Sequence, residues 1–559
     1  MGLNYAQTVT NVPQTMPIPG KDMVKNNAGG YTFEVSKWDY FTRFLILGTE
    51  GGTYYVQEKS LTVDAAKNVI ACIKEDPKRA LSLVLDVSLK GRAVKQNPTI
   101  FALALIAAET KGDDTEFNKE LKAAVTKVCR TSTMLFMYLS YVKTFRGLGP
   151  SVRKSIARFY ESLPVEQLDL NLIKYREREG FTHRDVMRLV HPKTKDARRN
   201  DLFAWAVGKK EAPAGSMAYT YEELKKMDHT KPADVKTVVA KIESDRLPRE
   251  ILPTPFLNIP EVWKAMLAAM PLTALIRNLG KMSSLDIFKS NLVKEVDVVV
   301  KKLTDAEYVR KSRIHPLQVL QASKTYATGR GVKGGNTWPV NSKILEGLDK
   351  AMELSYANVE PTGLRFLVGM DVSGSMTTSV LGMDNLSAYE ASAAYVSILN
   401  RIEPNVDVVA FGSKNPTGKP YWGRAQTFGW TAKNGNNNGL TVMDVPKHER
   451  IDKLVKRMQT EYSMGGGTDC ALPMLYALEK KIPVDVFVIT TDNESYAGTV
   501  HASKALQMYR KTMGINAKMI VLATAATKYT IADPKDPGML DIAGFDSSVT
   551  QVVSEFIKG

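Results

Sequence analysis

The sequence predicts an α + α/β protein, in which a long series of helices precedes a C-terminal domain built on a parallel sheet. Between Trp38 and Tyr356, apolar residues recur at intervals of three and four, and short Pro or Gly turns separate the segments. After Pro361, short apolar runs alternate with helical segments, which is typical of a parallel sheet covered by helices on both faces. The chain therefore joins two parts of different structural class.

The first part begins with a polar stretch and continues as helices. Residues 1–30 contain three prolines and a Gly29-Gly30 pair, and they predict a flexible N-terminal arm. Residues 31–360 predict a domain of many helices in series, which favours a helical repeat over a single bundle. The clearest helical segments are 65–73, 98–110, 117–129, 135–144, 152–163, 262–270 and 283–303.

Residues 361–559 predict the sheet domain. Strands are expected at 365–370, 406–411, 484–491 and 517–523, and helices at 386–402, 449–460, 471–480 and 501–513. The stretch from Gly412 to Lys447 is rich in Gly and Asn, and it predicts a long loop or hairpin excursion.

Charge separates the two parts further. The 559 residues include 75 Lys and Arg against 59 Asp and Glu, which gives a net charge of +16. Residues 361–559 hold 20 basic and 19 acidic residues, whereas residues 1–360 hold 55 and 40. A cationic module of net charge +15 is therefore joined to a nearly neutral domain.

Composition excludes several classes of protein. Three scattered cysteines, Cys72, Cys129 and Cys470, argue against a disulfide scaffold or a structural zinc site and fit a reducing compartment. The N-terminus has no apolar signal core, and no run of 18 apolar residues occurs. We therefore expect a soluble, cytoplasmic protein that does not insert into a membrane.

Oxygen-bearing side chains gather at the predicted strand ends. Asp371, Ser373 and Ser375 follow the first strand, Thr468 follows a glycine-rich loop, and Asp492 follows the strand at 484–491. The carboxyl ends of parallel strands meet at one edge of a sheet, so these five groups are expected to converge. Two carboxylates and three hydroxyls are hard ligands that suit Mg²⁺ best, ahead of Mn²⁺ and Ca²⁺.

Two alternatives compete with this cation site. Asp371 and its serines could merely cap a helix. A phosphoaspartate hydrolase would need a second Asp where Ser373 stands. The order of the whole set resembles the metal-ion-dependent adhesion site (MIDAS) of von Willebrand factor A domains, in which the five matching positions hold the ion. Asp469 is expected to cap the following helix rather than to bind the ion.

The densest basic stretch, residues 143–210, predicts a nucleic-acid surface. On a helix, Arg184, Arg188 and His191 fall at i, i+4 and i+7 and share one face, and Lys174 and Arg178 are also four residues apart. Nearby aromatic residues could stack on bases. The alternative is a solvated helix face with internal ion pairs, since acidic residues are interleaved.

Several longer strings resemble the Ro autoantigen ribonucleoprotein family, which combines a TROVE module with a von Willebrand factor A domain. The similarity extends over about residues 31–559, and Thr49 and Phe181 stand where the family pattern has Ser and Trp. The strings that carry it are Phe44–Tyr55, Lys174–His191, Pro271–Met282, Arg313–Leu320 and Asp371–Met376.

The resemblance implies a ring of HEAT-like helical repeats, closed within one chain by the von Willebrand factor A domain, and hence a monomer. It implies binding of small non-coding Y-type RNA on the basic outer surface, and of single-stranded 3′ ends of misfolded RNAs in a central hole, in RNA quality control. Lys174, Arg178 and His191 match the family's RNA-contacting positions, and Arg184 and Arg188 lie in the same segment.

The resemblance also implies a protein without catalytic activity. A protein partner could bind at the cation site, an exoribonuclease being one candidate. Two alternatives remain open at this stage: a cation-dependent protein-interaction module, and a metal-dependent hydrolase, which the pair of carboxylates supports only weakly because no general base accompanies it.

Overall fold

The computed structural model describes residues 12–34, 36–47, 67–90, 93, 96–110, 115–175, 177–178, 180–331, 335–377, 379–380, 383–412, 427–428, 439–462, 468–524, 529–543, 553 and 556–557. These residues form two compact units. We call the unit of Ile73–Leu89 and Thr99–Asn358 the helical unit. The described residues of Met1–Cys72, Lys90–Pro98 and Val359–Gly559 form the C-terminal unit.

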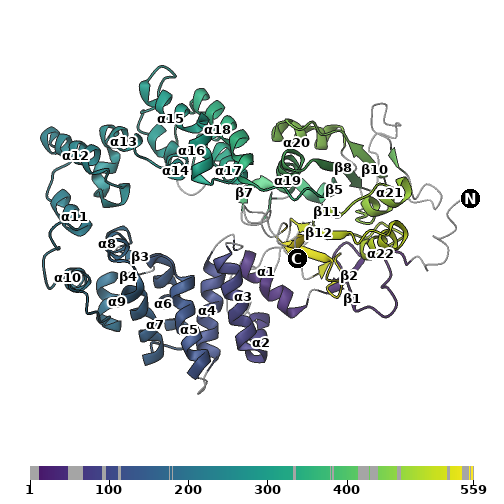
Figure 1. Cartoon of the computed structure of the whole chain (residues 1–559), viewed down its shortest axis with the longest axis horizontal. Helices are drawn as coiled ribbons and strands as arrows, with labels where there is room; N and C mark the ends of the chain where they lie inside the picture. The colour runs from purple at the N-terminus through teal and green to yellow at the C-terminus, as the bar shows by residue number, and fades with distance from the viewer. Residues whose placement is uncertain are drawn as a thin grey trace, which may run out of the picture. The chain divides into compact units, whose positions relative to one another are not determined.

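The helical unit confirms the prediction of helices in series. Helices α3, α5, α7 and α9 pack on one another in succession, so that every second helix stacks, as expected for repeated helical pairs (Figure 1). None of the helices in the described part of the chain is long and apolar enough to span a membrane.

The helices from α2 to α18 have the following bounds: α2 (Lys67–Glu75), α3 (Pro77–Leu89), α4 (Asn97–Glu109), α5 (Thr115–Val128), α6 (Ser132–Phe145), α7 (Pro150–Ser162), α8 (Val165–Lys174), α9 (His183–Val190), α10 (Ala197–Ala206), α11 (Met217–Lys225), α12 (Pro232–Asp245), α13 (Pro260–Leu267), α14 (Leu272–Ser283), α15 (Lys294–Thr304), α16 (Ala306–Ser312), α17 (Pro316–Ala327) and α18 (Ser342–Ser355). Between α8 and α9 lies a short hairpin of β3 (Glu177–Arg178) and β4 (Phe181–Thr182). The 3₁₀ helix η2 (Arg249–Ile251) follows α12.

The C-terminal unit is built on a seven-stranded sheet of order β14-β12-β11-β5-β8-β10-β9. Strands β14, β12, β11, β5 and β8 run parallel, and β10 and β9 add an antiparallel edge. The four expected strands are confirmed as β5 (Arg365–Asp371), β8 (Asn405–Gly412), β11 (Val486–Thr491) and β12 (Lys518–Ala523). The remaining elements are β9 (Thr427–Phe428), β10 (Gly439–Met443), β14 (Met539–Ala543), α19 (Ala388–Ile402), α20 (Ile451–Thr460), α21 (Leu472–Lys480), α22 (Ala502–Met513) and the hairpin of β6 (Ser379–Val380) and β7 (Met383–Ser387).

Part of the expected excursion at 412–447 is thus strand. β10 pairs with β8, and β9 pairs with β10, which is a hairpin-like return along the sheet edge. Residues 413–426 and 429–438 lie outside the described residues.

The expected flexible arm is wrong for residues 12–30. Residues 12–34, which we call the N-terminal strap, form β1 (Met23–Lys25) and β2 (Tyr31–Glu34), and β2 pairs with β13 (Tyr529–Thr530) of the C-terminal unit (Figure 1). Gln14 and Asn26 are buried because loops of that unit satisfy their amides. Helix α1 (Lys37–Leu47) also belongs to this unit, so the expected boundary at residue 31 is displaced. Residues 1–11 lie outside the described part.

Candidate functional site

The predicted cation ligands lie at the carboxyl ends of adjacent strands. β5 ends at Asp371 and pairs in parallel with β11, after which Asp492 follows directly. The side chains of Asp371, Ser373, Thr468 and Asp492 are buried, and Ser375 is half-buried. The open parallel sheet therefore brings both carboxylates to one edge, as the sequence predicted.

Hydrogen bonds fix the first of these carboxylates. The backbone N–H of Ser373 donates to Asp371 Oδ1 at 2.9 Å, and Thr491 Oγ1 donates to Asp371 Oδ2 at 2.8 Å. The hydroxyls of Ser373 and Ser375 lie 3.0 Å apart. The turn after β5 thus holds Asp371 and both serines in a single cluster.

The second carboxylate is less fully satisfied. Asp492 accepts the backbone N–H of Glu494 on Oδ1 at 3.1 Å and a hydrogen bond from the Ser375 side chain, whereas its Oδ2 is buried without a hydrogen-bond partner among the described residues. Thr468 lies beside this loop, because it forms a parallel bridge with Ser495 and its carbonyl accepts the N–H of Tyr496 at 3.1 Å. A buried carboxylate oxygen without a donor is the kind of atom that an ion would satisfy.

Electrostatics point the same way. Burial, and then the nearby charge of Asp492, raise the pKa of Asp371. Burial also raises the pKa of Asp492 and that of Glu494, the latter despite the hydrogen bonds that Glu494 accepts. Asp371 and Asp492 are thus neighbouring buried acids that resist ionisation together, and a cation beside them would relieve both burial and repulsion.

The chemistry of this set fits a hard cation. No group of three or more His, Cys, Asp or Glu side chains arranged to hold a metal occurs in the described part of the chain. An ion at this edge would therefore depend on the hydroxyls and on retained water as well as on the two carboxylates, which is the manner of Mg²⁺.

Asp469 takes the capping role expected of it. Its Oδ1 accepts the backbone N–H of Ala471 at 3.1 Å, just ahead of α21, and also the side-chain amide of Gln14 at 2.8 Å.

The sequence did not lead us to predict Glu494 as part of the site, although its position two residues after Asp492 was an available signal. Sequence reasoning also missed Gln14, for which the sequence holds no signal.

The basic face of α9 is present as predicted. Arg184, Arg188 and His191 are exposed, while the opposite face of the helix is buried. A capping box of Thr182 and Asp185 starts the helix, and His191 ends it in the left-handed conformation with φ of 49°. Arg184 and Arg188 therefore share the exposed face of α9 as predicted, whereas His191 is exposed directly after the helix and does not take the predicted i+7 helical position.

Lys174 is partly buried and forms an ion pair, so it is not a fully solvated cation. It ends α8, and its Nζ lies 2.7 Å from Glu250 Oε1 of η2, with side chains 36% and 30% exposed. Although burial alone would lower the pKa of Lys174, the hydrogen bond and charge of Glu250 raise it. Arg178 lies in β3, and its side chain lies outside the described part.

Aromatic rings accompany these cations. Lys174 Nζ lies 5.5 Å from the ring centre of Tyr175, and Lys143 Nζ lies 5.7 Å from that of Phe181. Both rings already contact a cation, so they are positioned beside charges that could meet phosphates.

His183 is a packed histidine and not a surface ligand. Its Nδ1 lies 3.0 Å from the hydroxyl of Tyr160, and its Nε2 lies 3.2 Å from the carbonyl of Asn171. Burial lowers the pKa of His183 to about 4, so the ring is neutral at pH 7 and belongs to the core of the helical unit.

Both units of the chain match known protein families. A model of the Ro60 vWA domain matches residues 365–557, and a model of the TROVE domain matches residues 24–247 and 240–327. The protein named RNA-binding protein RO60 of Deinococcus radiodurans is 36% identical over 556 residues, which cover 98% of each chain. The chain belongs to the Ro ribonucleoprotein family. The RNA-binding protein RO60 of Caenorhabditis elegans is 35% identical over 622 residues, covering 98% of this chain and 92% of that one.

A solved structure of a Ro protein has the same fold. The crystal structure of the Deinococcus radiodurans RO (RSR) protein matches with a TM-score of 0.72 and 34% identity, covering 94% of this chain and 100% of that one. The predicted fold class, a helical TROVE module with a von Willebrand factor A domain, is therefore confirmed.

Proposed function

We propose that this Ro family member is a non-catalytic RNA-binding scaffold that carries a divalent cation in its C-terminal unit. The observation that carries the proposal is the exposed pair Arg184 and Arg188 on α9, with the exposed His191 directly after the helix. Phosphate contacts of exposed arginines supply affinity without base specificity. The net charge of +15 over residues 1–360 supports the same role, and both RO60 relatives are named RNA-binding proteins.

The finer proposal concerns the kind of RNA. We infer that small structured RNA of the Y type binds the face that Lys174, Arg178, Arg184, Arg188 and His191 define, and that single-stranded 3′ ends of misfolded RNAs enter the hole of a ring. A surface of arginines and aromatic rings would suit the recognition of RNA by its shape better than the recognition of its base sequence. Such a protein would act in RNA quality control in the cytoplasm.

The cation proposal assigns the ligands by type. Asp371 and Asp492 would supply carboxylate oxygens, and Ser373, Ser375 and Thr468 would supply hydroxyls. The buried Asp492 Oδ2 without a described donor supports it. Bound there, Mg²⁺ would supply a positive charge that water or a partner's carboxylate completes.

A second function is supported by the same site. A cation with an open coordination position would recruit an acidic side chain of a protein partner, of which an exoribonuclease is one candidate. Hydrolysis is less well supported, because the further acid described beside the two carboxylates, Glu494, already accepts hydrogen bonds on both oxygens and is not poised to activate water.

Fluorescence anisotropy with labelled RNA tests the proposal. A duplex with a single-stranded 3′ tail and a blunt duplex of the same sequence are titrated at two salt concentrations. We expect tighter binding of the tailed RNA and a steep loss of affinity with salt. Equal affinity for both RNAs, or affinity that does not change with salt, contradicts the proposed mode of binding.

A further inference from the structure

The N-terminal strap crosses the two loops that carry Thr468 and Asp492. The described residues 492–500 form no helix or strand, yet most of them are buried. Buried backbone without a ladder needs polar partners from elsewhere. In this protein the strap supplies them, from residues more than 450 positions earlier in the chain.

Gln14 provides the most connected of these contacts. Its Nε2 donates to Asp469 Oδ1 at 2.8 Å and to the carbonyl of Val500 at 2.9 Å. Its Oε1 accepts from Ser495 Oγ at 2.7 Å and from the N–H of Gly498 at 3.1 Å. With 1% of its surface exposed, this one amide fixes both loops at once.

The position of Gln14 matters because of the residues next to its partners. Asp469 directly follows Thr468, and Ser495 lies three residues after Asp492. Ser495 Oγ also lies 3.3 Å from the carbonyl oxygen of Thr468. The Gln14 amide therefore sets the separation of the loops that carry Thr468 and Asp492.

A second part of the strap holds Glu494. Asn27 Nδ2 donates to Glu494 Oε1 at 3.0 Å, and the N–H of Ala28 donates to Glu494 Oε2 at 3.1 Å. The hydroxyl of Tyr529 also donates to Oε1. Since the backbone N–H of Glu494 donates to Asp492 Oδ1, holding the Glu494 side chain also orients Asp492.

The strap packs so closely on these loops that two positions in the contact have room only for glycine. A Cβ at Gly30 would lie 2.1 Å from the carbonyl oxygen of Ser495, and one at Gly498 would lie 2.4 Å from both Asp469 Oδ1 and Gln14 Nε2. A side chain at position 30 would push the strap away from the backbone of Ser495, and one at position 498 would displace the side chains of Asp469 and Gln14. The two glycines allow the close approach on which the hydrogen bonds of Gln14 depend.

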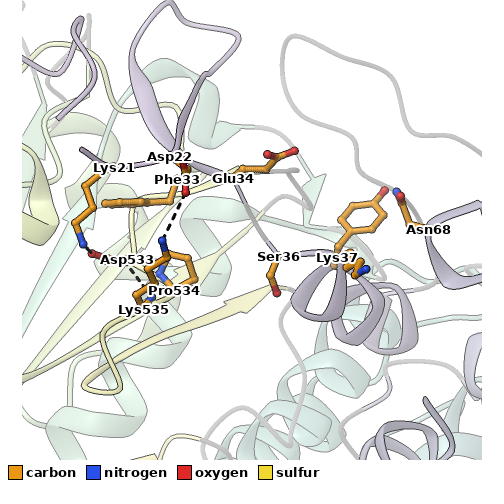
Figure 2. Close-up of a pocket in the computed structure, with 11 residues that line it drawn as sticks. Lys21, Asp22, Phe33, Glu34, Ser36, Lys37, Asn68, Asp533, Pro534 and Lys535 are labelled. Atoms are coloured by element: carbon orange, nitrogen blue, oxygen red, sulfur yellow. Dashed lines mark hydrogen bonds and ion pairs between the residues drawn. The ribbon is translucent and has the colours of Figure 1, made fainter. Parts of the chain in front are cut away.

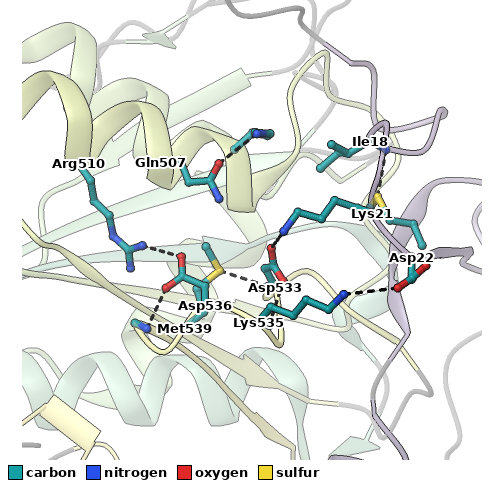
Figure 3. Close-up of polar contacts among 12 residues, drawn as sticks. Ile18, Lys21, Asp22, Gln507, Arg510, Asp533, Lys535, Asp536 and Met539 are labelled. Atoms are coloured by element: carbon teal, nitrogen blue, oxygen red, sulfur yellow. Dashed lines mark hydrogen bonds and ion pairs between the residues drawn. The ribbon is translucent and has the colours of Figure 1, made fainter.

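Ion pairs anchor the strap at a separate place. Lys21 Nζ lies 2.7 Å from Asp533 Oδ2, and Lys535 Nζ lies 3.5 Å from Asp22 Oδ2 (Figures 2 and 3). Figure 2 shows these residues at the edge of a cavity of about 550 Å³. Because these two ion pairs hold the strap without involving Gln14, Asn27 or Ala28, this anchor serves as an internal control.

We infer that Gln14, Asn27 and Ala28 are positioning residues of the cation site, so that cation binding and strap docking stabilise each other. The inference rests on the proposed cation site. Partners that orient the ligands of a metal contribute to its affinity through geometry. Reciprocity follows from linkage: whatever docking adds to cation affinity, the cation adds to docking.

Calorimetric titration of the full chain with Mg²⁺ tests the inference. Gln14→Met keeps the volume of the side chain and removes its four hydrogen bonds, and we expect the Kd for Mg²⁺ to rise about tenfold. Asn27→Ala removes a bond to Glu494 and should raise the Kd less. Lys21→Met loosens the separate anchor and should leave the Kd within about twofold.

Hydrogen exchange gives a readout that mere loss of stability would not move. Mg²⁺ should slow amide exchange across residues 12–34 in the natural sequence, and should not do so in Asp371→Asn. If the natural sequence takes up no Mg²⁺, the cation site itself is wrong. If it takes up Mg²⁺ but Gln14→Met and Asn27→Ala bind equally well, or if Mg²⁺ leaves the strap's exchange unchanged, only the positioning role is refuted.

Discussion

Removing one acidic side chain should strengthen RNA binding. Lys174 is held by Glu250 at 2.7 Å, so RNA that contacts this lysine must first compete with a carboxylate. In Glu250→Gln, the lysine keeps a weak neutral hydrogen-bond partner and loses the competing charge. The account therefore predicts tighter RNA binding from a substitution that replaces none of the proposed RNA-binding residues.

The size of the effect follows from the exposure of the pair. Side chains that are 36% and 30% exposed form an ion pair that solvent screens in part. Such pairs contribute about 0.5–1 kcal/mol, so freeing Lys174 should tighten RNA binding about two- to fivefold. One more phosphate contact should also steepen the dependence of log K on log salt by about 0.7–0.9.

Anisotropy titrations across a salt series measure both quantities. Glu307→Gln is the matched control, because Glu307 pairs with Arg310 and Lys311 on the exposed face of α16. It removes the same charge from the same unit and should change RNA affinity by less than twofold. Unchanged or weaker RNA binding by Glu250→Gln, or an equal gain in Glu307→Gln, would refute a role for Lys174 in contacting RNA.

Three further predictions follow from buried groups. Asp371→Asn removes one of two neighbouring buried carboxylates, so it should abolish the rise in Tm that Mg²⁺ produces without lowering the Tm in EDTA. As a control, Asp485→Asn breaks the ion pair of Asp485 with Arg365, and it should lower the Tm but keep the rise that Mg²⁺ produces. The pKa of His183 is about 4 in the folded protein, so the unfolded chain takes up the proton first and stability falls as pH drops below about 6.5; His183→Gln should remove about 2 kcal/mol of the loss between pH 7 and 5 in urea titrations, and an unchanged pH dependence would contradict the burial of a neutral ring. A Cβ at Gly369 would lie 2.5 Å from Pro473 Cγ, so Gly369→Ala should cost about 1–3 kcal/mol of unfolding free energy, and a neutral result would show that α21 can shift away from β5.

The sequence predicted those parts of the sites whose residues are close together in the chain or lie at the ends of adjacent strands. Asp371, Ser373 and Ser375 are joined by a tight turn, and a strand end adjacent to theirs leads into Asp492, so topology alone predicted their convergence. The exposed face of α9 followed from helical spacing, and the same spacing places His183 with Val186 and Val190 on the buried face.

Long-range pairs lay beyond sequence reasoning. Gln14 meets Asp469 across 455 residues, and nothing in a polar, proline-rich segment indicates that its amide will be buried. Glu250 neutralises Lys174 from a short 3₁₀ turn that has no pattern of its own. Contacts of this kind depend on tertiary packing, and they decide which predicted site residues are free to act.

Affinity for 3′-tailed RNA after removal of Arg184 and Arg188 tests the central claim most directly. Arg184→Ala with Arg188→Ala should weaken binding at least about tenfold and lower the salt slope by about 1.4–1.8, the value for two phosphate contacts. Arg310→Ala with Lys311→Ala removes the same charge from α16 and should leave binding within about twofold. Equal losses in the two double variants, or none in the first, would contradict an RNA-binding surface on α9.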